Sequence, residues 1–285
     1  MTLTMGTGPF GHAPAGVFEP ELPRTGLVFL EPYPRRMRGI LAGETIVDST
    51  RGLLLYEPGR LPRCFFPAED VRMDLLEPGA AGKPSAVLGE SKGWDLRLGD
   101  RLVERAALGY PAPPPGADRL RGLVALYWRA MDEWYEEDER ALAHVRDPYH
   151  RVDALASSRH VRVSLDGVTL AKSRRATIIY ETGLVPRWYF PREDVLAPLT
   201  PTDLTSRCAY KGEANYWSVL VGDAPHANLA WTYTAPRRDA EPVRDRVAFF
   251  NERVDIAVDG VSDERPGGPW ADPNWWRDNT FENEL

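Results

Sequence analysis

The decapeptide CAYKGEANYW, residues 208–217, brings a thiol, an ammonium group, a carboxylate and three aromatic rings together. A cysteine becomes a nucleophile when a neighbouring cation favours its thiolate, and Lys211 or Arg175 could supply that cation. Cys208 is therefore the candidate catalytic residue. A catalytic cysteine normally has a histidine base, however, and of the five histidines only His226 lies within the strands that the two copies share. A buried, inert thiol is the alternative interpretation.

The same stretch offers groups that could hold a ligand. Lys211 precedes Gly212 in a predicted turn, where its ammonium group could meet a carboxylate or a phosphate while backbone N–H groups also approach. Arg175 stands at the entry to a predicted strand and could bind an anion through two parallel hydrogen bonds. Tyr210 and Tyr216 would stack on the bound molecule. The alternatives are a solvated turn lysine and an arginine that pairs with a carboxylate of its own domain.

The elements that position these residues occur twice in the chain. Segment 37–71 aligns without gaps to segment 161–195, and 16 of the 35 aligned positions are identical. The alignment continues, after a one-residue gap, with GESKGWDLRLGD from Gly89 on GEANYWSVLVGD from Gly212. A repeat of roughly a hundred residues is a domain and not a solenoid unit. Charged positions that recur in both copies are Arg51 and Arg175, Glu57 and Glu181, Arg63 and Arg187, and Asp70 and Asp194.

Each copy reads mainly as antiparallel β-structure. Val161, Val163 and Leu165 alternate with polar residues, and Asp166-Gly167 is a preferred pair for a type I′ hairpin turn. The runs that follow are β-branched and aromatic and are separated by Gly, Pro and Asp, as strands and turns usually are. The sequence therefore predicts two homologous small antiparallel β domains, each a small barrel or sandwich.

A helix is expected to end each copy. In residues 118–140, Leu120, Val124 and Tyr127 recur at spacings of three and four, with Asp118 placed as an N-cap. A weaker pattern of the same kind runs from about Pro242 to Val254. Both segments are predicted as α-helices.

These patterns predict five regions along the chain. Residues 1–35 form an N-terminal extension, 36–140 the first domain, 141–157 a linker, 158–259 the second domain and 260–285 a tail rich in Pro, Gly and Trp. The tail carries Trp270, Trp275 and Trp276, which would plug an interface or close over a cleft as a lid.

Comparison of the two copies separates residues of the fold from candidates for function. Three positions keep their residue, namely Gly89 and Gly212, Glu90 and Glu213, and Trp94 and Trp217. Three others change, since Ser85, Val87 and Leu88 stand where Cys208, Tyr210 and Lys211 stand. We therefore expect the second trio to be dispensable for folding and available for function. Drift on an exposed loop is the alternative.

The pieces RVSLDGVTLAKSRRATIIYE, YFPREDV, CAYKGEANYWSV, LAWTY and VAFFNERVDI resemble, in order and spacing, a bacterial family known as domain of unknown function 427 and sometimes labelled nucleotidyltransferase-like. The resemblance covers both copies, and it implies a β-tent-like fold of two small antiparallel sheets. Proteins of that class often carry zinc on paired CxxC motifs, which this chain lacks. It also lacks a P-loop and the Gly-Ser with paired aspartates of nucleotidyltransferases.

Composition excludes several classes of protein. A net charge of −7 with scattered Lys and Arg provides no basic stripe for nucleic acid. No run of eighteen apolar residues and no secretory leader is found, so we expect no membrane span and a cytoplasmic location. Two cysteines are too few for a disulfide framework or a four-cysteine zinc site, and we expect no metal and no cofactor.

The leading functional hypothesis is therefore binding of a small molecule, anionic or nucleotide-like, in a pocket of the second domain, with catalysis as an addition. The competing hypothesis is a non-catalytic module for protein interaction, in which the aromatic residues are core.

Overall fold

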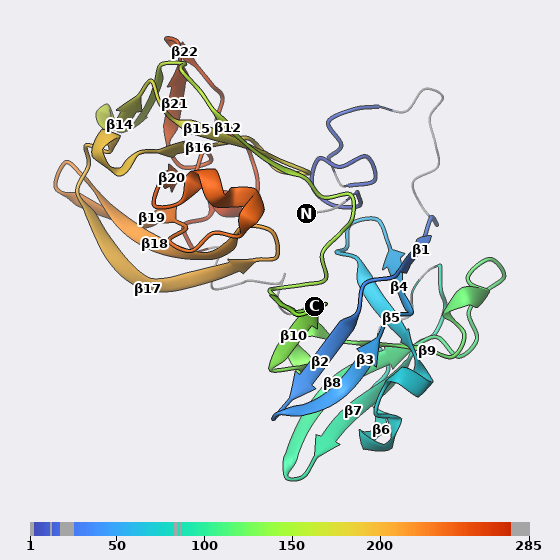
Figure 1. The fold of residues 1–285 in the computed structure, drawn as a ribbon. Helices are drawn as coiled ribbons and strands as arrows, with labels where there is room; N and C mark the ends of the chain where they lie inside the picture. Colours follow the sequence, from blue (N-terminus) through green and yellow to red (C-terminus); the bar gives the residue numbers. More distant parts are fainter. Residues whose placement is uncertain (1–2, 12, 18–25, 83–84, 86, 275–285) are drawn as a thin grey trace. The chain divides into compact units, whose positions relative to one another are not determined.

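The structure is a computed structural model that describes residues 3–11, 13–17, 26–82, 85 and 87–274. Two compact units divide the chain, and the boundary lies between Pro148 and Tyr149. Both units are built from antiparallel strands (Figure 1). Within the described residues, no helix is long and apolar enough to span a membrane.

Unit one contains a seven-stranded and a four-stranded sheet among its described residues. The larger sheet has, in spatial order, β1 (Phe29–Tyr33), β4 (Gly52–Tyr56), β5 (Arg63–Pro67), β9 (Leu123–Leu126), β8 (Arg101–Gly109), β7 (Lys92–Leu98) and β6 (Leu76–Gly79). The smaller sheet has β11 (Glu139–Ala141), β10 (Glu133–Glu136), β2 (Met37–Leu41) and β3 (Glu44–Ser49).

Unit two repeats this arrangement. Its larger sheet has β12 (Val152–Ala156), β15 (Thr177–Glu181), β16 (Arg187–Phe190), β20 (Val247–Phe249), β19 (Ala224–Thr232), β18 (Gly212–Val221) and β17 (Leu199–Cys208). Its smaller sheet has β14 (Val168–Ser173), β13 (Val161–Leu165), β21 (Asp255–Val258) and β22 (Val261–Ser262). Every strand of unit one has its counterpart eleven strands later in the same place, which confirms the tandem repeat.

The alternating pattern places the main core of unit two between its two sheets. Val161, Val163 and Leu165 on β13 are buried there with Phe190 of the larger sheet. The hairpin from β13 to β14 turns at Asp166 and Gly167, which have φ values of 50° and 78°. Positive φ at both central residues is what a type I′ turn requires, so the predicted hairpin is confirmed.

The prediction of a helix at the end of each copy was wrong. Residues 118–140 contain two short 3-10 turns and three strands, and residues 242–254 contain the end of one such turn and one strand. Gly122 has a φ of +74°, which breaks a helix, and β9 satisfies its backbone by pairing with β5 and β8. Hydrogen bonding to neighbouring strands therefore outweighs the preference for a helix that the spacing of the apolar residues indicated. The 3-10 turns are η1 (Ala68–Asp70), η2 (Met73–Leu75), η3 (Asp118–Leu120), η4 (Trp128–Ala130), η5 (Arg192–Asp194), η6 (Arg238–Val243) and η7 (Pro269–Ala271).

Two segments expected outside the domains contribute strands to them. The expected extension, residues 1–35, supplies β1, which pairs with β4. The expected linker, residues 141–157, supplies β12, which pairs with β15. Of the tail, Trp270 is described and packs against unit two, whereas Trp275 and Trp276 lie outside the described residues.

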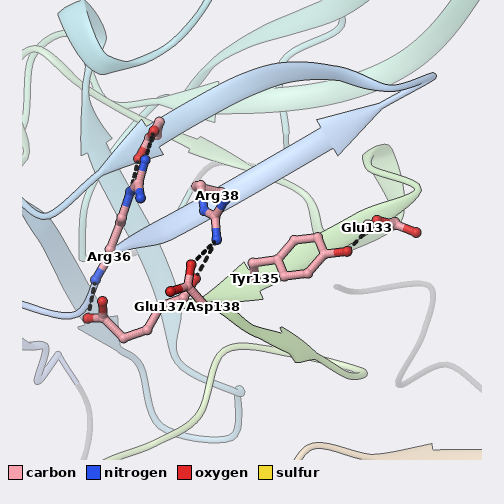
Figure 2. A network of polar contacts seen from close by, with 7 residues as sticks. Arg36, Arg38, Glu133, Tyr135, Glu137 and Asp138 are labelled. Atoms are coloured by element: carbon pink, nitrogen blue, oxygen red, sulfur yellow. Dashed lines mark hydrogen bonds and ion pairs between the residues drawn. The ribbon is translucent and has the colours of Figure 1, made fainter.

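A surface network ties β2 to the turn after β10 in unit one (Figure 2). Arg36 makes two hydrogen bonds to Asp48, of 2.7 and 2.5 Å, and its backbone N–H donates to Glu137. Arg38 donates to the Glu137 carbonyl and to Asp138. In unit two, an aspartate at the equivalent turn likewise accepts hydrogen bonds from an arginine and a backbone N–H. Because both copies have a hydrogen bond from a backbone N–H to an acidic residue of this turn, we assign that contact to the fold.

Candidate functional site

One face of the larger sheet in unit two is lined by aromatic side chains. The face opposite the main core carries Ile179, Tyr189, Ala214, Tyr216, Trp231, Tyr233, Ala248 and Phe250. Cross-strand pairing explains the grouping, because Tyr216 lies opposite Trp231 and Trp231 lies opposite Ala248. The coil of η6 lies beside β18–β20 in Figure 1, and its residues Ala240 and Val243 pack on these rings. We call this surface the aromatic face.

A buried ion pair lies at one end of the aromatic face. Lys211 donates a hydrogen bond from Nζ to Glu181 Oε2, and each residue is only 8% exposed. The second carboxylate oxygen of Glu181 lies 3.1 Å from His150 Nε2. The alternative interpretation, a solvated turn lysine, is thus wrong. This lysine is buried and paired, although it belongs to the turn between β17 and β18.

Electrostatics keep this pair ionised. Burial alone would raise the pKa of Glu181, but the Lys211 ammonium group and the hydrogen bond from His150 hold it below its usual range. Burial likewise opposes the charge of Lys211, yet the Glu181 carboxylate raises the pKa of Lys211 above its ordinary value. At neutral pH the lysine is therefore a hydrogen-bond donor and not a nucleophile.

Tyr210 supports the ion pair from the side. Its ring stacks on the His150 ring, with centroids 3.6 Å apart and planes 16° from parallel, and the residue is 2% exposed. Because His150 contacts Glu181, the stack fixes the position of the ion pair. The structure thus gives Tyr210 a positioning contact, and it places His150 at the site although the sequence put this residue in a linker.

Three tyrosine hydroxyls converge near Lys211. The Tyr189 oxygen accepts a hydrogen bond from Trp231 Nε1 at 3.2 Å, and the Tyr216 hydroxyl lies 2.8 Å from Ser206 Oγ. Tyr233 interacts electrostatically with both of these tyrosines and with Glu181. The Tyr216 ring itself stacks on Phe250 with centroids 6.2 Å apart.

Cys208 belongs to the same cluster. It is the last residue of β17, lies opposite Gly212, and is partly exposed with a free thiol. It interacts electrostatically with Lys211, Tyr216 and Tyr233. Gly212 adopts a φ of 103° in the turn, a conformation that side chains rarely tolerate. The structure thus brings Cys208, Tyr210, Lys211 and Tyr216 together, as the sequence indicated.

Arg175 lies elsewhere. Its guanidinium group donates to Asp194 at 3.1 and 2.9 Å and contacts Glu193 on the exposed surface. Arg51 makes the same pair with Asp70 in unit one, which assigns the pair to the fold. Six residues of extended chain separate Arg175 from Glu181, a span of roughly 20 Å. Arg175 is therefore not adjacent to the Lys211 cluster.

A second buried ion pair lies on the same face and was missed in the sequence. Arg187 donates to both carboxylate oxygens of Glu252 at 2.7 and 2.6 Å, with the side chains 8% and 1% exposed. The Arg187 guanidinium carbon lies 5.8 Å from the Trp231 ring centroid and 5.7 Å from that of Trp270. Comparison of the two copies could have indicated this pair. Arg187 recurs as Arg63, but the position of Glu252 holds an arginine in the first copy, so the carboxylate partner of Arg187 is a difference between the copies.

The equivalent face of unit one has apolar side chains at most of these positions. By the register of the two sheets, Leu88 replaces Lys211, Phe65 replaces Tyr189, Gly93 replaces Tyr216 and Leu108 replaces Trp231. Leu88 and Phe65 are completely buried. Tyr110 retains the phenol of Tyr233. The same fold therefore packs this surface without the ion pair, and the polar groups of unit two are not needed to form the sheet.

A shallow depression of about 290 Å³ lies in unit one, between β1 and the start of β4. The charged residues that line it are Arg51 and Arg119. Since Arg51 is held by Asp70, this depression offers little free charge to a ligand.

Comparison with known proteins identifies the repeated domain. A search of the curated proteins found no match. One protein-family model matches the chain twice, over residues 29–137 and 153–260, and these ranges agree with the two units and their strands. Together they cover well over half of the chain. The protein therefore belongs to the family described as Domain of unknown function (DUF427) and contains its domain twice.

Proposed function

We propose that the second domain binds a small organic molecule at the cluster formed by Lys211, Cys208 and the hydroxyls of Tyr189, Tyr216 and Tyr233. One observation carries the proposal. The cluster places an ammonium group, a thiol and three phenol hydroxyls next to one another among aromatic side chains. A few polar groups placed together among apolar and aromatic side chains are typical of sites for small organic molecules.

The first domain supports this interpretation as an internal control. It builds the same sheet with Leu88 and Phe65 at the positions of Lys211 and Tyr189. Replacement of a buried ion pair by apolar residues is often neutral or stabilising, so stability alone does not favour retaining the pair. A role in ligand binding explains why the second domain retains polar groups whose burial is energetically costly.

The proposal gives the residues different roles. Lys211 and the tyrosine hydroxyls contact the ligand, whereas Tyr210 and His150 position Glu181 and, through it, Lys211. Cys208 lines the site, and the proposal assigns it no bond-making step. A cytoplasmic location, expected from the sequence, would expose the site to metabolites and nucleotides.

The test is a thermal-shift screen of metabolites and nucleotides against the full chain, since a ligand that binds only the native state raises its melting temperature. Hits are repeated on Tyr233→Phe, which removes one hydroxyl of the cluster, and on the double variant Lys211→Leu/Glu181→Gln, which removes the ammonium group without leaving a buried charge. Lys172→Leu, an exposed lysine on β14, is the matched control. The proposal requires that hits be weakened in the first two proteins and kept in the control. Hits that bind all four proteins equally would place the ligand elsewhere.

A further inference from the structure

We infer that β17 is an interaction surface at which the chain pairs with a second copy of itself. In this pairing the two β17 strands run antiparallel about a two-fold axis at Thr205, so that Asp203 of each copy lies opposite Arg207 of the other. The inference is independent of the proposed ligand site. It follows from the free edge of the sheet, from the charges along that edge and from the position of a proline.

β17 is a long edge strand. It has 10 residues and pairs with β18 on one side, and within the described residues no strand pairs with its other side (Figure 1). Its counterpart in unit one, β6, has 4 residues. An edge strand presents a row of unpaired backbone N–H and C=O groups, which is a template for another strand. The second domain therefore offers a longer free edge than the first.

The exposed side chains of this edge carry opposite charges. Asp203 and Arg207 are exposed, as is Thr205 between them. Among the described residues, the Asp203 side chain makes no ion pair and no hydrogen bond. Arg207 contacts Glu213 through Nε at 3.2 Å, and its two terminal nitrogens donate no hydrogen bond to the described residues. An unpaired carboxylate and the free end of a guanidinium group thus lie on the same edge.

The charges select one register for two copies of β17. Antiparallel pairing of identical strands joins residues that lie at equal distances on either side of the axis. An axis at Thr205 places Asp203 opposite Arg207, and by symmetry this contact occurs twice in the dimer. An axis at Leu204 or at Ser206 places each charged residue opposite an uncharged one. Opposite charges across a strand pair are stabilising, so the axis at Thr205 is favoured.

The position of Pro201 favours the same axis. Proline has no N–H to donate to a ladder and cannot lie within the paired stretch of a strand. With the axis at Thr205, the paired stretch runs from Thr202 to Cys208, which is all of β17 after the proline. The proline and the charges therefore agree on separate grounds. The ladder is short, and β17 is irregular between Pro201 and Thr205, so we expect a weak and reversible dimer.

The test measures the association of the full chain by sedimentation velocity, from about 10 µM to about 1 mM. We expect a monomer–dimer equilibrium that weakens as the salt concentration rises, because both charge pairs are exposed. Asp203→Arg and Arg207→Asp each place like charges opposite one another, and each should raise the dissociation constant at least about tenfold. An equimolar mixture of the two variants restores opposite charges at both contacts and should form a heterodimer. Lys172→Asp, a charge reversal on the edge strand β14, is the matched control and should leave the association unchanged.

Cross-linking tests the position of the axis. Thr205→Cys, in a chain that also carries Cys208→Ser, places the two new thiols next to each other at the axis, and mild oxidation should give a disulfide-linked dimer. Thr200→Cys in the same background is the control. Thr200 is also exposed on β17 but lies outside the paired stretch, so this variant should stay monomeric.

Each part of the inference can be rejected. A chain that remains monomeric at about 1 mM rejects pairing with a second copy, in favour of a strand from another protein or a solvated edge. A dimer that neither charge reversal weakens, or a mixture of the two variants that stays monomeric, rejects the contact between Asp203 and Arg207. Cross-linking of Thr200→Cys as fast as that of Thr205→Cys rejects the axis. Circular dichroism checks that each variant is folded, so that loss of the dimer is not loss of the domain.

Discussion

The substitution Lys211→Leu tests the buried ion pair with the residue that the first domain uses at the same position. Leu88 is completely buried there, so a leucine fits this turn of the fold. In the second domain, however, the substitution leaves the Glu181 carboxylate without its cation. The structure therefore predicts a large loss of stability from a change that the repeat itself tolerates.

The magnitude follows from burial. Removal of one partner of a buried ion pair costs about 3–5 kcal/mol, mainly because the remaining charge is uncompensated. Glu181 keeps its contact with His150, so we expect a value at the lower end, about 3 kcal/mol. The double variant Lys211→Leu/Glu181→Gln removes both charges, and its free energy of unfolding should fall by less than half as much.

The loss of stability caused by Lys211→Leu depends on pH, and the direction of this dependence follows from the pKa of Glu181. In the native protein the pKa of Glu181 lies below its unfolded value, so its contribution to stability is present above pH about 4 and is lost below it. In Lys211→Leu, burial should raise the pKa of Glu181 above its unfolded value. The folded variant is then favoured when the carboxyl is protonated, and the penalty grows as the pH rises from about 4 toward 7.

Urea unfolding followed by circular dichroism and tryptophan fluorescence, at pH 7.5 and 4.5, measures this effect. Lys172→Leu is the control for loss of an exposed lysine. A change of less than about 0.5 kcal/mol in Lys211→Leu at pH 7.5, as for an ordinary surface substitution, would refute the buried ion pair. A double variant less stable than the single one would refute the assignment of the cost to the Glu181 carboxylate.

Three further predictions concern other parts of the second domain and the thiols. Glu252→Ala should lower the free energy of unfolding by about 3–5 kcal/mol, because Arg187 is left buried without a negatively charged partner, and an unchanged urea midpoint would contradict this. In the folded protein Cys208 should react with a thiol reagent, whereas Cys64, buried and with its pKa raised by burial, should react only after unfolding; mass spectrometry of the labelled peptides distinguishes them. Gly212→Ala should destabilise the protein by about 1–3 kcal/mol, since φ is 103° and the new Cβ would lie 3.2 Å from a backbone oxygen, and calorimetry should show the lower melting temperature.

The local pattern of the sequence was enough to identify the repeat, the β class and the motif. Alternation with period two, the Asp166-Gly167 turn and the matched Arg and Asp positions depend on neighbouring residues in the chain, and all of them recur in the structure. The cluster of Cys208, Tyr210 and Lys211 could also be predicted from the sequence, because comparison of the two copies shows which positions change while the strands stay the same.

The tertiary structure decided which side chains meet. Lys211 and Glu181 are thirty residues apart, the first in the turn between β17 and β18 and the second at the end of β15, so their pairing depends on how the seven-stranded sheet twists and curves. The same geometry brings His150 to Glu181 and leaves Arg175 near the opposite end of β15. Residues 118–140 form strands in spite of their helical spacing, because neighbouring strands satisfy their backbone hydrogen bonds. Contacts of this kind are set by strand order and sheet curvature, which no local pattern of residues encodes by itself.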